Sequence, residues 1–181
     1  MRLRYLVVLL GLLLGGAAQG GNDVQADYRA VPSLRHHLPI NIPEAASLSE
    51  EAMRDLECLS WNLYFEARGG TRAEQIAVAY VPINRSASPR FSRDICTNVF
   101  QYGWAGGRRQ YQFSWAGTVR GPNWRREDET WIRMQRIALD VYTRQVRDTA
   151  NGATHFHHSR IGPSRGARNV ITLGSHVFWR M

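Results

Sequence analysis

The stretch from residue 47 to residue 70 constrains the fold more than any other part of the sequence. Ser47 and Glu50 stand three residues apart, which is the spacing of a capping box at the start of a helix. Apolar residues then recur at helical spacing, at Ala52, Leu56, Leu59 and Leu63. This pattern predicts an amphipathic helix that buries one stripe, and Gly69-Gly70 is expected to end it.

A second helix is predicted directly after the glycine pair. Thr71 and Glu74 form another capping box. The residues expected to face the interior are Ile76, Ala77, Ala79 and Tyr80. Pro82 interrupts this pattern. Because proline lacks a backbone N–H and its ring crowds the preceding turn, we expect a kink or an early stop there.

The second half of the chain has a different pattern. Residues 86–123 are aromatic, glycine-containing and basic, and without a helical period they favour short strands and loops that line a groove. A third helix is predicted over residues 125–147, with an inner stripe of Trp131, Met134, Ala138 and Val141. Two strands are expected after it, in "ATHFHH" and "VITLGSHVFW". The expected fold class is α+β, a helical lobe followed by a small antiparallel β-sheet.

The first residues are typical of an export signal. The run "MRLRYLVVLLGLLLGGAAQG" combines two arginines, an apolar core and small residues, and predicts a signal peptide over residues 1–20. Its apolar core is too short for a permanent membrane span. Residues 21–46 are predicted to be a linker and residues 47–181 the functional domain. We therefore expect an exported protein of the periplasm or cell wall.

The charge of the chain is strongly positive. It has 23 basic residues, all of them arginine, against 15 acidic ones, which gives a net charge of +8. A basic surface attracts polyanions. No motif of a nucleic-acid-binding domain is present, so we expect an anionic wall polymer or lipid headgroups and no nucleic acid. A GC-rich genome explains the arginine bias equally well.

Two cysteines occur, Cys58 and Cys96. In an exported chain an even number of cysteines is compatible with a disulfide. Two buried free thiols fit the sequence equally well, because a domain of this size does not need a covalent link.

The segment "YFEARGG" contains the candidate acid. Glu66 follows Leu63 by three residues and Leu59 by seven, which places it at the end of the buried stripe. A carboxylate there loses water, so its pKa rises. A carboxyl group that keeps its proton near neutral pH can act as the general acid in glycosidic bond cleavage. The alternative is a partly exposed glutamate at a helix end, paired with Arg68.

The segment "QFSWAG" has side chains suited to a sugar subsite. Phe113 and Trp115 can stack on sugar rings, while Gln112 and Ser114 can form hydrogen bonds with hydroxyl and acetamido groups. The alternative is that both rings fill a small core.

Histidines near the C-terminus suggest a rival chemistry. Strand alternation places His155 and His157 on one face, and with His176 on a partner strand they would offer a zinc site. That would make the protein a zinc amidase that cuts peptide stems. No H-E-x-x-H motif is present and no acidic ligand lies beside the histidines. We therefore interpret His155 and His157 as groove residues that bind sugar or orient Glu66, and we expect no metal or other cofactor.

Several separated blocks resemble one known family. The run "CLSWNLYFEARGG…EQIAVAYVPINR…F…ICTNVFQ…QFSW…GATHFHHSRIGPSR…LGSHVFWR" resembles the SleB-type cell wall hydrolases, the family of the spore-cortex-lytic enzymes, from about Leu56 to Arg180. The resemblance implies a peptidoglycan glycosidase with a lysozyme-like or lytic-transglycosylase-like active site, in which Glu66 is the acid. It also favours a cleft position for residues 112–115. In such enzymes one glutamate protonates the leaving oxygen and then acts as base. The 6-OH of the muramic acid attacks and leaves a 1,6-anhydro product.

The chain departs from the family pattern at two positions. An acid usually follows the glycine of the "YFEARG" block, where this chain has Gly70, and Pro82 stands where an aliphatic residue is expected. Both changes could alter the groove. An ordinary hydrolase would also need a second carboxylate, and the candidates are Asp94, Asp128 and Asp148. None of the three is a confident choice, since Asp128 suits a helix start and Asp148 a turn.

We therefore expect an exported enzyme that cleaves peptidoglycan glycan strands, specifically a lytic transglycosylase acting at the MurNAc-GlcNAc bond. The alternatives are a zinc-dependent amidase and a wall-binding module without turnover.

Overall fold

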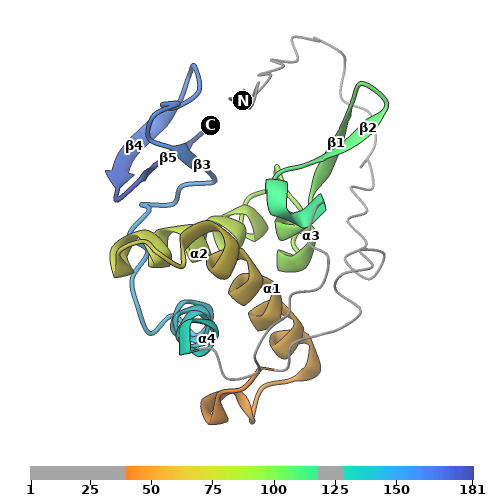
Figure 1. Cartoon of the computed structure of the whole chain (residues 1–181), viewed down its shortest axis with the longest axis vertical. Helices are drawn as coiled ribbons and strands as arrows, with labels where there is room; N and C mark the ends of the chain where they lie inside the picture. Colours follow the sequence, from red (N-terminus) through yellow and green to blue (C-terminus); the bar gives the residue numbers. More distant parts are fainter. Residues whose placement is uncertain (1–39, 118–128) are drawn as a thin grey trace, which may run out of the picture.

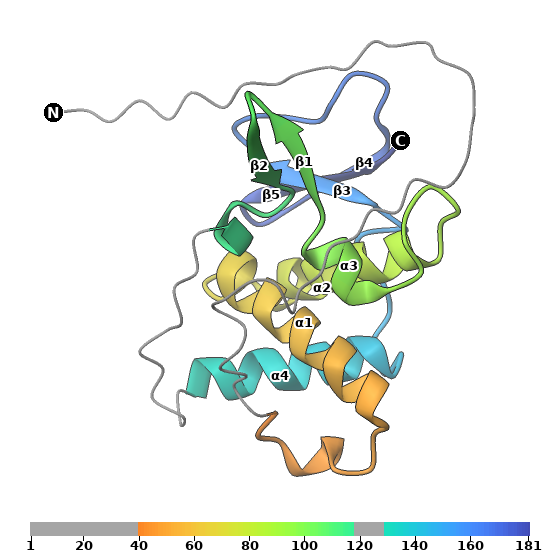
Figure 2. The same cartoon turned by 90° about the vertical axis from the view of Figure 1, so that its right-hand side faces the viewer.

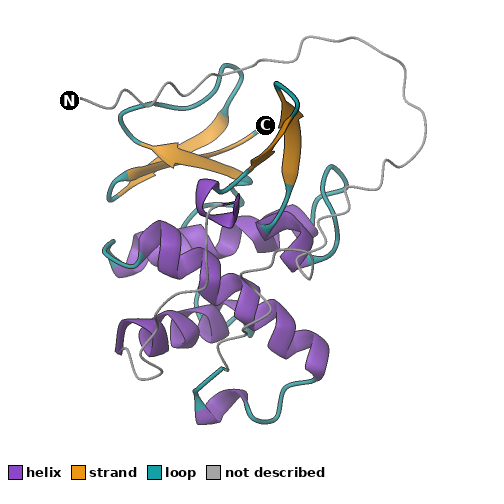
Figure 3. Ribbon diagram, turned by 45° about the vertical axis from the view of Figure 1, so that its right-hand side comes forward, coloured by secondary structure: helices purple, strands orange, loops and turns teal. Residues whose placement is uncertain are grey.

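The computed structural model describes residues 40–117 and 129–181. Its helices pack together as one lobe, and the β-strands lie on one side of that lobe (Figures 1 and 2). The main helices are α1 (Glu50–Ala67), α2 (Arg72–Ser86) and α4 (Glu129–Tyr142). The strands form the hairpin β1 (Tyr102–Ala105) and β2 (Arg108–Tyr111), and an antiparallel sheet of β3 (His155–His158), β4 (Arg168–Leu173) and β5 (His176–Arg180). This mixture of helices and small antiparallel sheets, coloured by type in Figure 3, confirms the predicted α+β class.

Helix α1 buries the predicted stripe. Leu56, Leu59 and Leu63 are fully buried, and Ala52 is buried as well. The helix begins at Glu50, and the side chain of Ser49 caps it by accepting a hydrogen bond from the backbone N–H of Ala52. The prediction that Ser47 caps this helix was therefore wrong, because the cap is Ser49, two positions later.

The folded domain begins before the predicted boundary at residue 47. The short 3₁₀-helix η3 (Pro43–Ala45) and the turn after it occupy the residues just before α1, which is why the cap falls on Ser49. Ile42 and Ala45 are buried in the core between the helices. The end of the predicted linker thus packs on the domain. The rest of it and the predicted signal peptide, residues 1–39, lie outside the described residues.

Helix α2 continues through Pro82 instead of stopping there. The Thr71/Glu74 capping box is confirmed, and all four residues predicted to face inward are buried. Pro82 cannot donate to the carbonyl of Val78, four residues earlier. The buried Asn62 Nδ2 of α1 donates to that carbonyl instead, at 3.5 Å. The predicted early stop at Pro82 was therefore wrong, and the Asn62 side chain of another helix takes the place of the missing donor.

Two further helices differ from the prediction. Helix α3 (Ile95–Val99) lies in the region predicted to hold only strands and loops, and its five residues are too few to show a period. Helix α4 ends at Tyr142, not residue 147, because Arg144 adopts a left-handed conformation with φ 61°. Its predicted inner stripe is confirmed: Trp131, Met134, Ala138 and Val141 are all buried. The predicted start of this helix, residues 125–128, lies outside the described residues.

The C-terminal sheet has three strands where two were predicted. The run "VITLGSHVFW" forms a hairpin of β4 and β5, and β5 is the central strand in the order β3-β5-β4. The pairs Phe156↔Phe178 and His158↔His176 share one face of the sheet. Phe178 on this face is part of the hydrophobic core formed with the helices. His155, His157 and Trp179 lie on the opposite face.

A disulfide joins Cys58 of α1 to Cys96 of α3. The two cysteines lie within a second core cluster, which includes Trp61, Phe100 and Trp115. The structure therefore selects the bridge over two free thiols. Because the aromatic cluster packs against the last turns of α1, the covalent link also supports the end of the helix that carries Glu66.

Candidate active site

Glu66 lies in the last turn of α1, where that helix reaches the strands (Figure 2). Its side chain is partly buried, and this burial raises the pKa of Glu66 to about 7. The nearby Trp115 side chain favours the ionised form and so lowers the pKa, but it does not cancel the effect of burial. A pKa in this range lets Glu66 carry its proton close to neutral pH, as a general acid requires.

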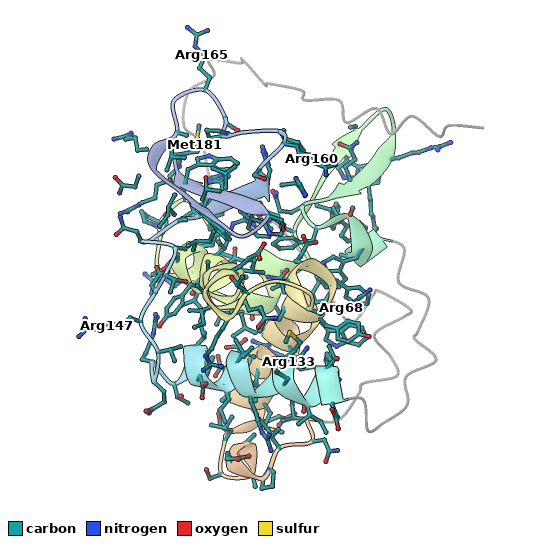
Figure 4. All side chains as sticks on the ribbon, turned by 60° about the vertical axis from the view of Figure 1, so that its left-hand side comes forward. Arg68, Arg133, Arg147, Arg160, Arg165 and Met181 are labelled. Carbon is teal, nitrogen blue, oxygen red and sulfur yellow. A yellow bond between two sulfur atoms is a disulfide. The ribbon has the colours of Figure 1, made fainter. Side chains whose placement is uncertain are left out.

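The Arg68 side chain interacts with Tyr64. Its guanidinium lies over the ring of Tyr64, 4.8 Å from the ring centre, and donates a hydrogen bond to the carbonyl of Tyr64. The side chain is exposed at the end of α1 (Figure 4). The structure thus gives no support to the alternative in which Glu66 is an ordinary surface glutamate paired with Arg68.

Trp115, in the predicted sugar-binding segment, lies beside Glu66 and affects its pKa. Trp115 and Phe113 are buried, with exposed fractions of 8% and 4%, and Trp115 stacks on Phe65 with ring centres 4.8 Å apart. Rings that pack in the interior cannot offer open faces to a sugar, so the prediction of stacking by Phe113 and Trp115 is not supported. Gln112 and Ser114 are exposed, and sugar binding by these two side chains stays a prediction.

His155 and His157 contact other residues of the sheet face that carries Trp179. His155 stacks on Trp179, and burial together with Arg85 and Arg90 lowers the pKa of His155 to about 4, so it is uncharged at neutral pH. His157 Nδ1 lies 2.9 Å from the carbonyl oxygen of Gly162. The predicted direct orientation of Glu66 by either histidine is not supported by these contacts.

The three histidines do not form the zinc site that the rival hypothesis needs. Cross-strand pairing puts His176 opposite His158, on the other face of the sheet from His155 and His157. Throughout residues 40–117 and 129–181, no group of three or more His, Cys, Asp or Glu side chains could hold a metal ion. The ligand set of the rival hypothesis is not formed, because alternation along β3 and pairing with β5 put its members on different faces.

His176 instead belongs to a network around Glu74 that sequence reasoning described only as a cap. The buried Glu74 carboxylate accepts hydrogen bonds from Ser175 Oγ at 2.7 Å and Ser175 N at 2.9 Å, and lies 2.6 Å from His176 Nδ1. Burial alone would raise the pKa of Glu74, but these hydrogen bonds and the nearby His176 hold it below its ordinary value. No sequence signal points to this network, because its partners lie about 100 residues apart.

Two glycines make room for the Glu74 carboxylate. A Cβ at Gly70 would lie 2.4 Å from Glu74 Oε2, closer than any non-bonded contact allows. Gly174, in the β4–β5 turn, has a positive φ of 56° and would bring a Cβ closer still. At Gly70, where the family pattern usually has an acid, the Glu74 side chain occupies the space that a side chain would need.

Gln75 holds the end of α1 in place. Its buried side-chain Nε2 donates to the carbonyls of Ala67 and Arg68, at 3.0 and 3.3 Å. The last carbonyls of a helix lack partners within the helix, so a buried helix end needs such a donor. Because Ala67 directly follows Glu66, Gln75 fixes the backbone that carries the candidate acid.

The candidates for a second carboxylate are engaged elsewhere. Asp94 caps α3 by accepting from the backbone N–H of Thr97 and pairs with Arg54. Asp148 accepts hydrogen bonds from the backbone N–H groups of Ala150 and Gly152 in the turn before β3. Asp128 lies outside the described residues. Asp148 has the turn role that the sequence suggested, and Asp94 has a capping role that the sequence analysis did not assign.

Exposed arginines occur on several parts of the surface. Figure 4 shows Arg133 on α4, Arg147 after it, and Arg160 and Arg165 in the loop between β3 and β4. These four arginines come from two parts of the described chain, α4 with the segment after it and the β3–β4 loop, so positive charge is present on more than one part of the described surface. A distributed positive charge suits attraction to an extended polyanion over a wide area more than one defined anion site.

These features define a class: an α+β domain with a partly buried glutamate whose pKa suits proton transfer. The chain belongs to the Cell Wall Hydrolase family, the family of the SleB-type spore-cortex-lytic enzymes, because the family model matches residues 69–179, more than half of the chain. Glu66 lies three residues before this match begins. A search of curated proteins and a search of solved structures gave no match. Family membership supports a general role in peptidoglycan hydrolysis.

No helix in the described part of the chain combines the length and the apolar character needed to cross a membrane.

The raised pKa of Glu66 predicts a pH-dependent effect on stability. The folded protein binds this proton more tightly than the unfolded chain, so stability is lost as the pH rises from about 4.5 to above 7. Glu66→Gln removes the titration. We expect its free energy of unfolding, relative to wild type, to be higher at pH 8 than at pH 4.5 by up to about 3 kcal/mol. Urea unfolding at both pH values measures this, and an equal difference at the two would contradict a raised pKa.

Proposed function

We propose that the protein is an exported lytic transglycosylase that cleaves peptidoglycan glycan strands between MurNAc and GlcNAc. The observation that carries the proposal is the environment of Glu66, a carboxyl group with a pKa of about 7 at the end of a helix, beside the Trp115 side chain. Such a group can donate a proton below pH 7 and accept one after it has ionised.

The proposed reaction uses Glu66 twice. The protonated carboxyl group donates its proton to the glycosidic oxygen, and the bond between that oxygen and C1 of MurNAc breaks. The resulting carboxylate then removes the proton from the 6-hydroxyl of the same MurNAc, whose oxygen attacks C1. The products are a 1,6-anhydro-MurNAc end and a free GlcNAc end, and Glu66 regains its proton.

Attack by the internal hydroxyl is favoured over attack by water for one reason. A hydrolase that uses water needs a second carboxylate across the sugar as base or nucleophile. The described candidates Asp94 and Asp148 are held by hydrogen bonds at a helix cap and in a turn. Between these two described candidates, Glu66 has no dependable second carboxylate to assist it.

Product analysis tests the proposal. Purified sacculi are digested with the protein, and the released muropeptides are separated and weighed by mass spectrometry. We expect ends of 1,6-anhydro-MurNAc, lighter by one water than the hydrolysis product. Reducing MurNAc ends would contradict the transglycosylase step, released stem peptides would favour an amidase, and binding without release would favour a wall-binding module.

Removal of metal ions is predicted to leave glycan cleavage unchanged. In the proposed reaction Glu66 supplies both proton transfers, and His155, His157 and His176 lie on two faces of the sheet, so they do not form one ligand set. Activity is measured on sacculi before and after exhaustive dialysis against a chelator. A loss that zinc restores would contradict the proposed acid–base mechanism.

A further inference from the structure

The turn between α1 and α2 has no side chain at the position where the family pattern usually has an acid. That position is Gly70 in this chain. The carboxylate of Glu74 fills the space instead, because a Cβ built on Gly70 would overlap Glu74 Oε2 and lie only 2.9 Å from Glu74 Cδ. The two chain positions therefore point to the same place, and in this chain the carboxylate comes from the second of them.

The distances show that a glutamate at position 70 can put its carboxylate in this place. Two C–C bonds of about 1.5 Å separate the carboxyl carbon of a glutamate from its Cβ, which gives about 2.5 Å between these two atoms. The distance from a Gly70 Cβ to Glu74 Cδ is 2.9 Å, which is similar. Gly70 also has no positive φ, so its backbone accepts a side chain without strain.

The Glu74 carboxylate connects the turn after α1 to the β4–β5 turn. Its Oε2 atom accepts a hydrogen bond from the backbone N–H of Thr71, at 3.3 Å. Its Oε1 atom accepts from the backbone N–H and the hydroxyl group of Ser175, and His176 Nδ1 lies 2.6 Å from the same atom. Both oxygens are therefore used, each toward a different segment of the chain.

This contact leaves the His176 ring held at Nδ1 and open at Nε2. Burial raises the pKa of Glu74, but its hydrogen bonds and His176 hold that pKa below its ordinary value, so the group is ionised at neutral pH. A carboxylate only accepts hydrogen bonds, so Nδ1 must carry the proton. Among the described residues Nε2 has no hydrogen-bond partner, and it is not one of the fully buried polar atoms. The exposed 9% of His176 therefore includes Nε2.

His176 lies on the sheet face that contacts the aromatic cluster beside Glu66. The Phe156 ring lies between the His176 ring, at 5.2 Å, and the Phe113 ring, at 5.8 Å. Phe113 in turn stacks on Trp115, whose side chain affects the pKa of Glu66. On the helix side, Gly70 follows Glu66 by only four residues. The network is thus next to the candidate acid on both sides.

We propose that Glu74 takes over the task of the acid that the family pattern has at position 70, and that it is a positioning residue for glycan cleavage. It holds His176 with its proton on Nδ1 and with Nε2 open at the surface, and it fixes the β4–β5 turn against the turn that follows Glu66. The proposal rests on the proposed role of Glu66, but not on whether the 6-hydroxyl or water attacks.

Returning the carboxylate to position 70 tests the proposal. Glu74→Ala removes it, and Gly70→Glu in the same chain supplies it from the other position. Small displacements of reacting groups cost about 10²-fold in rate, so we expect Glu74→Ala to slow muropeptide release from saturating sacculi by at least about tenfold, with binding to sacculi retained. The double variant should recover a rate within a few-fold of wild type. All rates are measured below the Tm of each variant.

Two matched controls separate the charge and its position from the filling of space. Gly70→Gln combined with Glu74→Ala fills the same space but has one acceptor oxygen in place of two. Gly69→Glu combined with Glu74→Ala carries the charge one residue earlier, where a Cβ meets no atom within 4 Å and the side chain has open space. Neither control should recover the rate.

The His176 ring gives a readout that a purely structural role would not change. Nitrogen NMR on the labelled full chain, at a pH where histidine is neutral, reports which ring nitrogen carries the proton. We expect the proton on Nδ1 in wild type and in the variant with Gly70→Glu and Glu74→Ala. In Glu74→Ala and in both controls we expect it on Nε2, the form that is preferred without a partner at Nδ1.

The proposal is overturned if Glu74→Ala cleaves as wild type does, if Gly70→Glu does not restore the rate, or if the His176 proton is on the same nitrogen in all variants. If Glu74→Ala alone does not fold, Gly70→Glu should restore folding and activity where the controls do not, and failure to do so also overturns it. Reducing ends released by wild type would contradict the transglycosylase step alone, so the two failures are distinguishable.

Discussion

Glu66→Gln is expected to lower the rate of glycan cleavage by at least about 10²–10⁴-fold, because the amide cannot donate a proton to the glycosidic oxygen. The substitution nearly preserves the shape of the side chain, so the fold and wall binding should be retained. The rate is measured as release of soluble muropeptides from purified sacculi, with binding followed by cosedimentation.

Glu51→Gln is the matched control for this experiment. Glu51 lies on the same helix but is exposed near its first turn, far along the sequence from Glu66. This variant should cleave at the wild-type rate. Cleavage by Glu66→Gln within a few-fold of wild type would remove Glu66 from the role of acid. The pH profile of wild type adds a second readout, since activity that depends on the protonated form should fall as the pH rises through about 7.

Gly174→Ala is expected to lower the free energy of unfolding more than any other substitution proposed above. The new Cβ would overlap the Glu74 carboxylate. It would also stand at a backbone φ of 56°, which residues other than glycine rarely adopt. To avoid the clash, the carboxylate must leave Ser175 or His176, which leaves buried polar groups unpaired. Losing a partner in such a network costs about 3–5 kcal/mol, which we expect as the decrease in the free energy of unfolding.

Gly166→Ala is the matched control, which introduces backbone strain without a clash with the Glu74 carboxylate. Gly166 has a positive φ of 85°, but a Cβ there meets no atom within 4 Å. Its cost should be only the backbone term of about 1–2 kcal/mol. Both variants are measured by urea unfolding at one pH. Equal losses in the two would show that the Glu74 network tolerates the added methyl group.

Patterns contained within one element could be predicted from the sequence. The stripe of α1 and the capping box of α2 depend on residues three to eleven positions apart, and both are present in the structure. The position of Glu66 at the end of that stripe followed from the same spacing, and burial raises its pKa as the pattern indicated. Local backbone geometry determines these features, so neighbouring residues are sufficient to reveal them.

Features that depend on how elements pack were decided only by the tertiary structure. Helix α2 runs through Pro82 because Asn62 of α1 supplies a donor to Val78. Trp115 and Phe113 are buried because several elements meet around them, although the segment by itself equally suits an exposed sugar platform.

The Glu74 network shows most clearly why contacts between distant segments could not be predicted from the sequence. In the sequence Glu74 is the end of a capping box, and His176 is one of three histidines with the apparent spacing of a metal site. In the structure, the two lie 2.6 Å apart because the β4–β5 turn packs against the start of α2. Local spacing was enough to predict the three long helices, the capping box of α2 and the position of the candidate acid. Only the packing of distant segments decided which polar side chains meet, because that depends on the relative placement of whole elements.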